Sequence, residues 1–289
     1  MIKINTIIIG LGDIGSGFSE LYKNERNHTV ATIKNKNFKL LYGIDLEKKK
    51  RSFFKKKFGV KTFDKVDKIP KKDEINFAII SSNTKSHQKI IRELIKFKNL
   101  KYILCEKPFC KNLNEAKKIQ KILKIRKIEL FINYFRRCLP YIKYIKKFIK
   151  NDNKKFVKVS YPKTLLNNGS HFIDLIFFLF KFKSFRLVKK NNYFRIIHKN
   201  IDCSFYENKD KKYQSKLIFE NKDRKLILKK NLIEYITRDE KLIKKIKFKN
   251  LYNQRFVLSH LINKIVNKKS SIATIDDGIN VHKVINKLL

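Results

Sequence analysis

The chain has 289 residues, 43% of them hydrophobic, so it can form two domains with separate cores and is too apolar for a disordered protein. Its formal net charge of +45 would attract nucleic acid or an anionic membrane. However, 59 of the 70 cationic residues are lysines, spread evenly along the chain, and no nucleic-acid-binding motif accompanies them. The charge therefore indicates a solvated surface without a specific nucleic acid partner, and it leaves open a role in gathering an anionic substrate.

The cysteines and the hydropathy pattern favour a cytoplasmic protein. Four irregularly spaced cysteines lack the paired spacing of a zinc site and are interpreted as reduced thiols: Cys105, Cys110, Cys138 and Cys203. The longest apolar stretch, 172–180, is about half as long as a membrane span. The first residues do not resemble a signal peptide. We therefore expect no metal, no membrane partner and no targeting segment.

The first half of the chain alternates short β-branched runs with helical patterns, which is typical of a parallel sheet joined by crossover helices. We expect strands at 4–9, 39–44, 75–81, 101–105 and 129–133, and helices at 14–23, 47–57, 86–98 and 112–127. This succession predicts an α/β Rossmann domain over residues 1–137.

Strand patterns become more frequent after Pro140. We expect helices at 141–150, 169–180, 254–267 and 277–288, and strands at 155–160, 193–198, 216–219, 225–229 and 232–236. This half predicts an α+β domain over residues 138–289 with an open, mainly antiparallel sheet. The last helix is free to pack back on the first domain, and the sheet would suit a homo-oligomer.

Residues Gly10, Gly12 and Gly15 form a G-x-G-x-x-G pattern that follows the first strand and opens a helix. Gly10 permits a tight turn, Gly12 allows close approach of a pyrophosphate, and Gly15 lets helix and strand pack together. Asp13 and Ile14 lie inside the pattern, where N–H groups at the helix start would bind the phosphates. The pattern predicts a dinucleotide cofactor.

Asp45 ends the second predicted strand, where a carboxylate accepts hydrogen bonds from the adenosine ribose and repels a 2′-phosphate. It lies 30 residues beyond Gly15, so an insertion near 24–37 must be accommodated. NAD is therefore the favoured cofactor. NADP is the alternative, because the cations from Lys48 to Arg51 stand close enough to neutralise a phosphate.

Further segments match a known family. They are the runs IISSNTKSH at 79–87, CEKPF at 105–109, NYFRR at 133–137, NNGSHFID at 167–174 and ATIDDG at 273–278. With these, the sequence resembles the glucose-fructose oxidoreductase, inositol dehydrogenase and MocA-like (Gfo/Idh/MocA) family over nearly its whole length. The resemblance implies hydride transfer between a nicotinamide cofactor and a hydroxyl or keto carbon of a sugar, cyclitol or nucleotide sugar.

The triplet Glu106-Lys107-Pro108 is the most specific of these segments. It follows the strand at 101–105, at the sheet edge where ligands of open α/β sheets bind. The resemblance implies that Lys107 contacts substrate and the nicotinamide ribose, with Glu106 beside the cofactor. Partial desolvation would suit Lys107 to orient a sugar hydroxyl or exchange a proton with it. A cis peptide at Pro108 would aim Lys107 inward.

His171 lies where the family has its proton-transferring histidine, so Lys107 and His171 are the expected catalytic residues. The family pattern begins with Asp, but this chain has Asn167, which can donate or accept a hydrogen bond without supplying charge. Asp174 follows one helical turn after His171 and is placed to orient it. The alternative is that His171 and Asp174 only cap an apolar helix.

Other polar residues complete the expected sites. Cofactor contacts are expected from Ser81, Ser82, Asn83 and His87, although His87 also suits a helix cap. The substrate site is expected to include Asn133, Tyr134, Arg136, Asn167 and Asp174. Arg136 and Arg137 would either pair with a substrate anion or lock the two domains together. The remaining histidines show no partner pattern and are expected to be ordinary residues: His28, His198, His260 and His282.

The sequence therefore predicts an NAD(P)-dependent oxidoreductase acting on a sugar-like substrate, in sugar or surface-polysaccharide biosynthesis. A non-catalytic dinucleotide-binding sensor of the same fold is the main rival, and it is favoured by Asn at position 167. A nucleic-acid binder, the third option, has only the net charge in its support.

Overall fold

The structure, a computed structural model, describes residues 3–19, 23–150, 155–210 and 213–289. These residues form two compact units, each with its own sheet. The first unit comprises Met1–Cys138 and Tyr252–His282, and the second comprises Leu139–Leu251 and Lys283–Leu289.

The division predicted at residue 137 differs from these units in the last part of the chain. Helix α8 (Asn253–Ile265) belongs to the first unit, where Val257, Leu258 and Leu261 join its hydrophobic core. Sequence periodicity revealed the helix but not the sheet whose core it completes, because an apolar stripe does not identify its partner.

Sheet A, in the first unit, has seven strands in the order β15-β6-β5-β4-β1-β2-β3. The strands are β1 (Ile4–Ile9), β2 (Phe38–Ile44), β3 (Lys61–Phe63), β4 (Phe77–Ile80), β5 (Tyr102–Cys105), β6 (Glu129–Ile132) and β15 (Ala273–Thr274). All neighbouring strands are parallel except β15, which runs antiparallel to β6. Every residue of β4 is fully buried, as expected for a strand covered on both faces. The predicted Rossmann domain is confirmed.

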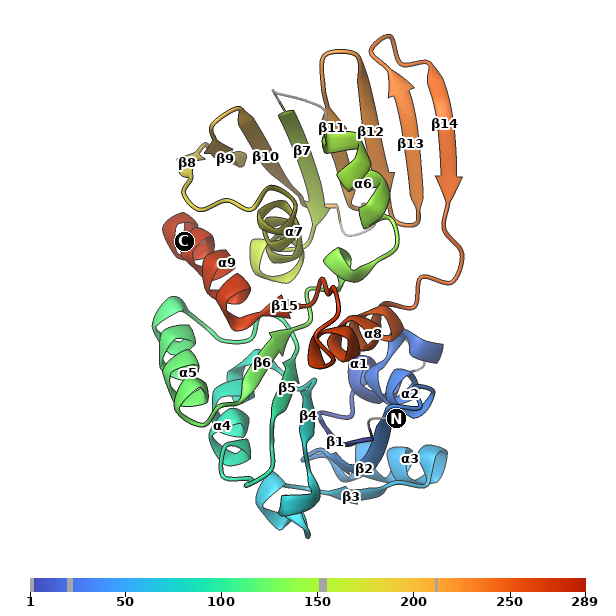
Figure 1. Cartoon of the computed structure of the whole chain (residues 1–289), viewed down its shortest axis with the longest axis vertical. Helices are drawn as coiled ribbons and strands as arrows, with labels where there is room; N and C mark the ends of the chain where they lie inside the picture. The colour runs from blue at the N-terminus through green and yellow to red at the C-terminus, as the bar shows by residue number, and fades with distance from the viewer. Residues whose placement is uncertain (1–2, 20–22, 151–154, 211–212) are drawn as a thin grey trace. The chain divides into compact units, whose positions relative to one another are not determined.

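Helices cover both faces of sheet A. They are α1 (Asp13–Ser16), α2 (His28–Ile33), α3 (Lys48–Phe58), α4 (Thr84–Leu94), α5 (Leu113–Ile125) and α8. Figure 1 shows α4 and α5 on one face and α2 and α8 on the other. A last helix, α9 (Ile275–Leu288), follows β15.

The helix predicted at 14–23 is wrong at residues 17–19. Gly17 adopts a left-handed conformation with φ of 72° and its N–H donates to the Asp13 carbonyl, which ends α1 after four residues. Residues 20–22 of the predicted helix lie outside the described residues. The expected insertion at 24–37 is real, and it contains α2, which begins where the Asn27 side chain accepts a hydrogen bond from Val30 N–H at 2.9 Å.

Sheet B, in the second unit, has eight strands in the order β14-β13-β12-β11-β7-β10-β9-β8. The strands are β7 (Lys155–Pro162), β8 (Arg186–Lys189), β9 (Tyr193–His198), β10 (Ile201–Asn208), β11 (Lys216–Glu220), β12 (Arg224–Lys229), β13 (Leu232–Thr237) and β14 (Leu242–Lys247). All pairs are antiparallel except β7 with β10. The mainly antiparallel sheet is therefore confirmed, although the parallel pair makes it more than a simple meander.

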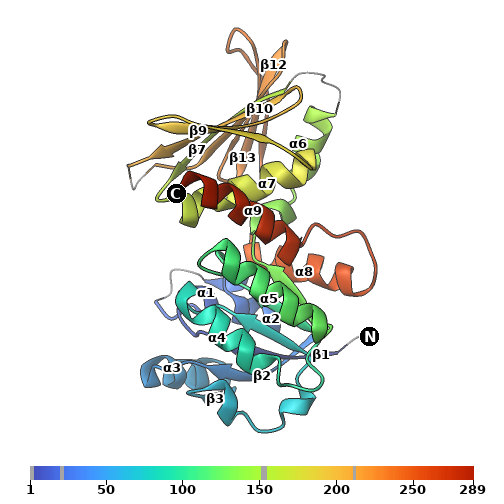
Figure 2. The same cartoon turned by 90° about the vertical axis from the view of Figure 1, so that its left-hand side faces the viewer.

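Two helices, α6 (Ile142–Ile149) and α7 (Ser170–Phe180), pack against one face of sheet B (Figure 2). On that face the Phe172 ring of α7 stacks on Tyr161, and the Phe148 ring of α6 contacts Tyr235. The opposite face carries aromatic side chains that are about 40% exposed, Phe156 and Tyr206.

The described residues contain no helix that is both long and apolar enough to cross a bilayer. Among the same residues, no group of three or more His, Cys, Asp or Glu side chains is arranged to hold a metal ion. All four cysteines are buried thiols.

His282, expected to be an ordinary residue, is buried beside a cysteine in the first unit. Its side chain is 2% exposed, its Nε2 lies 3.2 Å from Cys110 Sγ, and its ring meets Phe109 edge-on. Burial lowers the pKa of His282 from 6.5 to about 4. The folded protein therefore holds this imidazole neutral.

We predict that His282 makes the fold sensitive to mild acid. Between pH 6.5 and about pH 4 the unfolded chain binds a proton here and the folded chain does not, so acidification favours unfolding. The expected loss between pH 7 and pH 5 is about 2 kcal/mol. Chemical denaturation at both pH values should show a smaller loss for His282→Leu, whereas His198→Asn, at a partly exposed position, should lose as much as the wild type. An equal loss in His282→Leu would contradict the assignment.

Candidate functional site

The glycine pattern forms a closely packed turn between β1 and α1. Gly10 has a φ of 94°, and a Cβ there would lie 2.4 Å from the Ser82 nitrogen. A Cβ on Gly15 would lie 2.0 Å from the Gly10 carbonyl oxygen. By contrast, a Cβ on Gly12 would meet no atom within 4 Å. The packing of the turn therefore requires glycine at positions 10 and 15. Gly12 borders open space, which a pyrophosphate needs in order to approach the backbone closely.

Asp45 holds this turn to the end of β2. Its Oδ2 accepts a hydrogen bond from Leu11 N–H at 2.7 Å, and its Oδ1 accepts one from Glu47 N–H at 2.9 Å. Both carboxylate oxygens are therefore fixed in direction by the backbone. Asp13, also within the turn, accepts a hydrogen bond from Ser19 N–H at 2.6 Å.

A pocket of about 410 Å³ opens beside the turn. It contains the predicted residues Gly10, Gly12, Asp45, Ser81, Ser82 and Asn83. Ile14, Gly15 and His87 do not line it. The pocket also contains Lys50, one of the cations expected near the cofactor, and residues that sequence reasoning missed: Glu47, Asp64, Lys65, Lys89 and Glu93. Asp64 and Lys65 follow β3, a short strand with no clear sequence signal, and Lys89 and Glu93 belong to the helical repeat of α4.

The charge of this pocket is opposite in sign to that of the chain. Four carboxylates and three lysines line it, in a protein whose net charge is +45. Lys50 Nζ lies 2.5 Å from Glu47 Oε1, and this hydrogen bond raises the pKa of Lys50. Arg51 donates to the carbonyl oxygens of Asp45 and Leu46. Two of the cations expected to neutralise a phosphate are thus already engaged.

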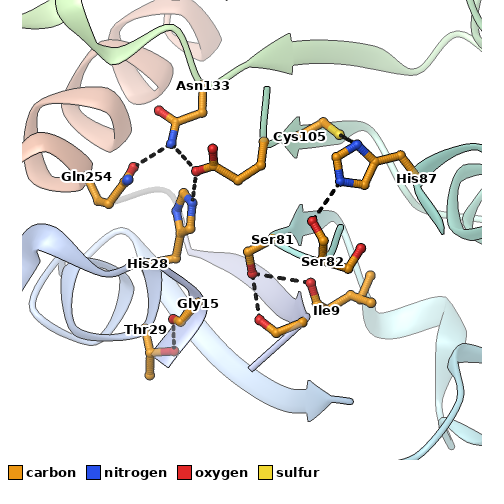
Figure 3. Close-up of polar contacts among 12 residues, drawn as sticks. Ile9, Gly15, His28, Thr29, Ser81, Ser82, His87, Cys105, Asn133 and Gln254 are labelled. Carbon is orange, nitrogen blue, oxygen red and sulfur yellow. Dashed lines mark hydrogen bonds and ion pairs between the residues drawn. The ribbon is translucent and has the colours of Figure 1, made fainter. Parts of the chain in front are cut away.

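Ser81 binds the glycine turn, and His87 is buried next to Ser82 and Cys105 (Figure 3). Ser81 Oγ donates to the Gly10 carbonyl at 2.7 Å, so it holds the glycine turn against β4. His87 is fully buried, with Nε2 3.0 Å from the Ser82 carbonyl and Nδ1 3.3 Å from Cys105 Sγ. Burial lowers the pKa of His87 and raises that of Cys105. His87 Nδ1 also lies 3.3 Å from the Phe109 carbonyl oxygen, so both ring nitrogens contact groups inside the first unit. His87 is therefore neither a helix cap nor a residue that faces the pocket.

The Glu106 carboxylate lies in a polar cluster at the carboxyl end of β5, together with the residues His28, Asn133 and Gln254 that Figure 3 labels. His28 Nε2 lies 2.9 Å from Glu106 Oε1, and Asn133 Nδ2 donates to the same oxygen. Asn133 Nδ2 also donates to Gln254 Oε1 at 3.0 Å. Burial raises the pKa of Glu106, but the hydrogen bonds from His28 and Asn133 and the charge of Lys107 outweigh it and lower the pKa. Glu106 is thus an anion.

Two predictions change because of this cluster. Asn133 is 1% exposed and supports Glu106 instead of facing a substrate. His28 was expected to be an ordinary residue, yet its side chain is completely buried against Glu106. A Glu buried after a strand needs a hydrogen-bond donor, which is the one sequence signal that could have prompted a search for His28.

The other predicted residues of the first unit differ in exposure. Lys107 is partly exposed, and the peptide bond between Lys107 and Pro108 is cis, as expected. Tyr134 is 1% exposed, while Arg136 is partly exposed and lies against the Phe135 ring. Arg137 is buried and pairs with Asp277 at 3.2 Å, both within the first unit. Arg136 is therefore the more exposed of the two arginines.

In the second unit, His171 and Asp174 lie on α7 and are 3% and 1% exposed. Asn167 belongs to a π-helical turn, Leu165–Gly169, that leads directly into α7. Its side chain is exposed, and its N–H donates to Thr164 Oγ1 at 3.3 Å. Such turns interrupt a regular helix and are common beside functional sites.

A second pocket, of about 500 Å³, opens in this unit between sheet B and the π-helical turn. Its apolar lining includes Phe194 and Phe205, whose rings stack at 4.6 Å. The charged residues of its lining are three lysines and one carboxylate: Lys189, Lys190, Lys209 and Glu207. This pocket therefore combines an aromatic wall with net positive charge, in contrast to the pocket of the first unit.

Comparisons with known proteins agree with this architecture. Residues 4–134 match the GFO_IDH_MocA family model, described as "Oxidoreductase family, NAD-binding Rossmann fold". The glucose-6-phosphate 3-dehydrogenase of Bacillus subtilis (strain 168) is 26% identical over 199 residues, which cover 60% of this chain and 53% of that protein. The match thus spans about half the length of this relative.

Solved structures extend the likeness of fold to the whole chain. A dehydrogenase (MviM) from Clostridium difficile superposes with a TM-score of 0.82 at 16% identity, covering 98% of each chain. The UDP-N-acetylglucosamine 3-dehydrogenase GnnA from Acidithiobacillus ferrooxidans has a TM-score of 0.78 at 15% identity, covering 100% of this chain and 97% of its own. At these identities the likeness shows a shared two-sheet fold.

We predict that Gly12→Ala separates cofactor binding from folding. A Cβ at Gly12 meets no protein atom, so the melting temperature should stay within about 2 °C of wild type. The same methyl group fills the space beside the turn, so the affinity for NAD should fall at least about tenfold, or ~1.4 kcal/mol. Calorimetric titration with NAD checks this. Gly10→Ala is the contrast, since its Cβ overlaps Ser82 and should lower both quantities; unchanged NAD affinity in Gly12→Ala would refute the prediction.

Proposed function

We propose, from the match of residues 4–134 to the Gfo/Idh/MocA family model, that this chain is an NAD-dependent oxidoreductase that transfers a hydride to or from a sugar carrying a phosphate group. The observation that carries the proposal is the pocket formed by the glycine turn and Asp45, whose open space at Gly12 suits a dinucleotide.

NAD fits the first pocket better than NADP does. The carboxylates of Asp45, Glu47 and Asp64 would all repel a 2′-phosphate, whereas Asp45 can accept hydrogen bonds from ribose hydroxyls. Lys50 is already paired with Glu47, and Arg51 is bonded to backbone carbonyls. The free energy of holding two further negative charges here would therefore be unfavourable.

A phosphate-bearing sugar fits the second pocket. Lysines at its rim attract an anion, while Phe194 and Phe205 offer the apolar surface on which sugar and base rings pack. Lys189 Nζ is held by the Leu288 carbonyl at 2.6 Å, which leaves Lys190 and Lys209 to meet the anion. Two of the similar proteins are named for oxidation at carbon 3 of phosphorylated sugars, glucose 6-phosphate and UDP-N-acetylglucosamine.

Lys107 and His171 are proposed to handle the proton of the reacting hydroxyl. NAD, when bound, supplies the hydride acceptor. Lys107 is partly exposed at the carboxyl end of β5, so its ammonium can hydrogen-bond a sugar hydroxyl. His171 is buried on α7, and an imidazole can both accept and donate a proton.

A second copy of the chain is proposed to cover the open face of sheet B. Phe156 and Tyr206 are about 40% exposed there, and Tyr206 stacks on Tyr193. Exposed aromatic side chains on a flat sheet are typical of protein interfaces.

We predict that Asp45 sets the preference for NAD. Asp45→Asn keeps an oxygen that can accept the Leu11 N–H bond but removes a charge, so NADP should gain about tenfold in affinity relative to NAD. Dissociation constants for both cofactors measure this. Asp73→Asn, an exposed change elsewhere in the same unit, is the matched control and should leave the ratio unchanged. If the ratio is the same in Asp45→Asn and wild type, Asp45 does not select the cofactor.

We predict that the wild-type protein reduces NAD when supplied with glucose 6-phosphate, UDP-N-acetylglucosamine or a related phosphorylated sugar. Lys107→Met should lower kcat about a hundredfold or more, because a positioned proton donor contributes that much, while NAD affinity stays within about threefold. Spectrophotometric assay of NADH across a sugar panel measures both steps. Binding of NAD without turnover of any sugar would favour a dinucleotide sensor instead, and full turnover by Lys107→Met would refute the role of Lys107.

A further inference from the structure

Glu106 uses only one of its two carboxylate oxygens within the protein. Oε1 accepts the hydrogen bonds from both His28 and Asn133. In the described part of the chain, Oε2 neither accepts a hydrogen bond nor is buried without a partner. The Glu106 side chain is 13% exposed. The exposed part of Glu106 is therefore an oriented, ionised oxygen that is open to a ligand.

The groups that hold Glu106 are themselves incompletely satisfied. His28 Nδ1 and Asn133 Oδ1 are both buried and have no hydrogen-bond partner within the described residues. The other polar atom of each side chain, His28 Nε2 and Asn133 Nδ2, contacts the same oxygen, Glu106 Oε1. Both side chains are therefore oriented by their contact with Glu106.

The cluster joins segments that are distant in sequence. His28 comes from α2, which lies within the insertion after the glycine turn, and Gln254 comes from α8. Gln254 is 1% exposed and fixes the amide of Asn133, which follows β6. Three elements thus converge on one carboxylate at the carboxyl edge of a sheet, the edge at which ligands of doubly wound folds bind.

We propose that His28 is a positioning residue that holds Glu106 as an oriented anion, and that Glu106 thereby makes the protein bind the cationic oxidised nicotinamide in preference to the neutral reduced one. This inference rests on the proposed NAD-dependent function. A fixed negative charge in a site that excludes water lowers the free energy of a nearby positive ring, and it has no such effect on a neutral ring. The adenosine end of the cofactor is unaffected, because the pocket beside Asp45 does not include Glu106.

Three ligands separate the effect from general damage: NAD⁺, NADH, and ADP-ribose, which lacks the nicotinamide. Glu106→Gln should weaken NAD⁺ binding about tenfold relative to NADH, with ADP-ribose affinity within about twofold of wild type. His28→Leu should reproduce this loss. His28→Gln keeps an N–H donor and should recover part of it, and His198→Gln in the second unit should change nothing. Calorimetric titration supplies all the dissociation constants.

Several outcomes would overturn the inference. An unchanged ratio of NAD⁺ to NADH affinity in Glu106→Gln would show that Glu106 does not act on the ring. A normal ratio of NAD⁺ to NADH affinity in His28→Leu would show that His28 does not position Glu106. In Glu106→Gln and His28→Leu, a loss of ADP-ribose affinity as large as the loss of NAD⁺ affinity would also contradict the inference. Failure of the wild type to bind ADP-ribose would instead refute the proposed function. If His28→Leu does not fold, His28→Gln and Glu106→Gln decide the matter together with ¹⁵N NMR of the free protein, in which Glu106→Gln should shift the His28 Nε2 resonance.

Discussion

The close approach of Gly15 to Gly10 is the constraint on which the first unit depends. The backbone of α1 rests directly on the carbonyl group of the turn, with no room for a side chain between them. Ser81 and Asp45 then bind the same turn from β4 and β2. Because every contact is made through the backbone of the turn, the direction of its N–H groups is set by the sheet. A dinucleotide would meet a surface formed before it binds.

Local charge, and not net charge, distinguishes the two pockets. The chain is rich in lysine, yet four carboxylates line the pocket beside the glycine turn. A fifth carboxylate, that of Glu106, directly precedes Lys107 in the sequence and is ionised. The pocket of sheet B keeps the positive sign of the surface. Fields from distant lysines are screened within about 8–10 Å by salt, so the groups lining each pocket decide which ligand it attracts.

Much of the fold could be predicted from the sequence because its signals are local. The β1 strand, the glycine turn and Asp45 follow fixed spacings, and α7 shows a continuous apolar pattern. The strand β14 escaped prediction because its lysine-rich sequence suits the edge of a sheet, where packing selects little. The partners of Glu106 escaped for another reason: His28 is 78 residues away from it, and Gln254 is 121 residues from Asn133. No periodicity connects positions so far apart.

The place of Asn167 changes what its departure from the family pattern means. Asn167 is exposed in the π-helical turn, whereas His171 and Asp174 are both buried on α7. Residues three apart on a helix are neighbours, so Asp174 is the acidic residue one turn along α7 from His171. A buried polar group acts on a neighbouring imidazole more strongly than an exposed one, because water screens the exposed group. An acidic side chain on the same helix as His171 is therefore present in this chain, and Asn at 167 does not remove it.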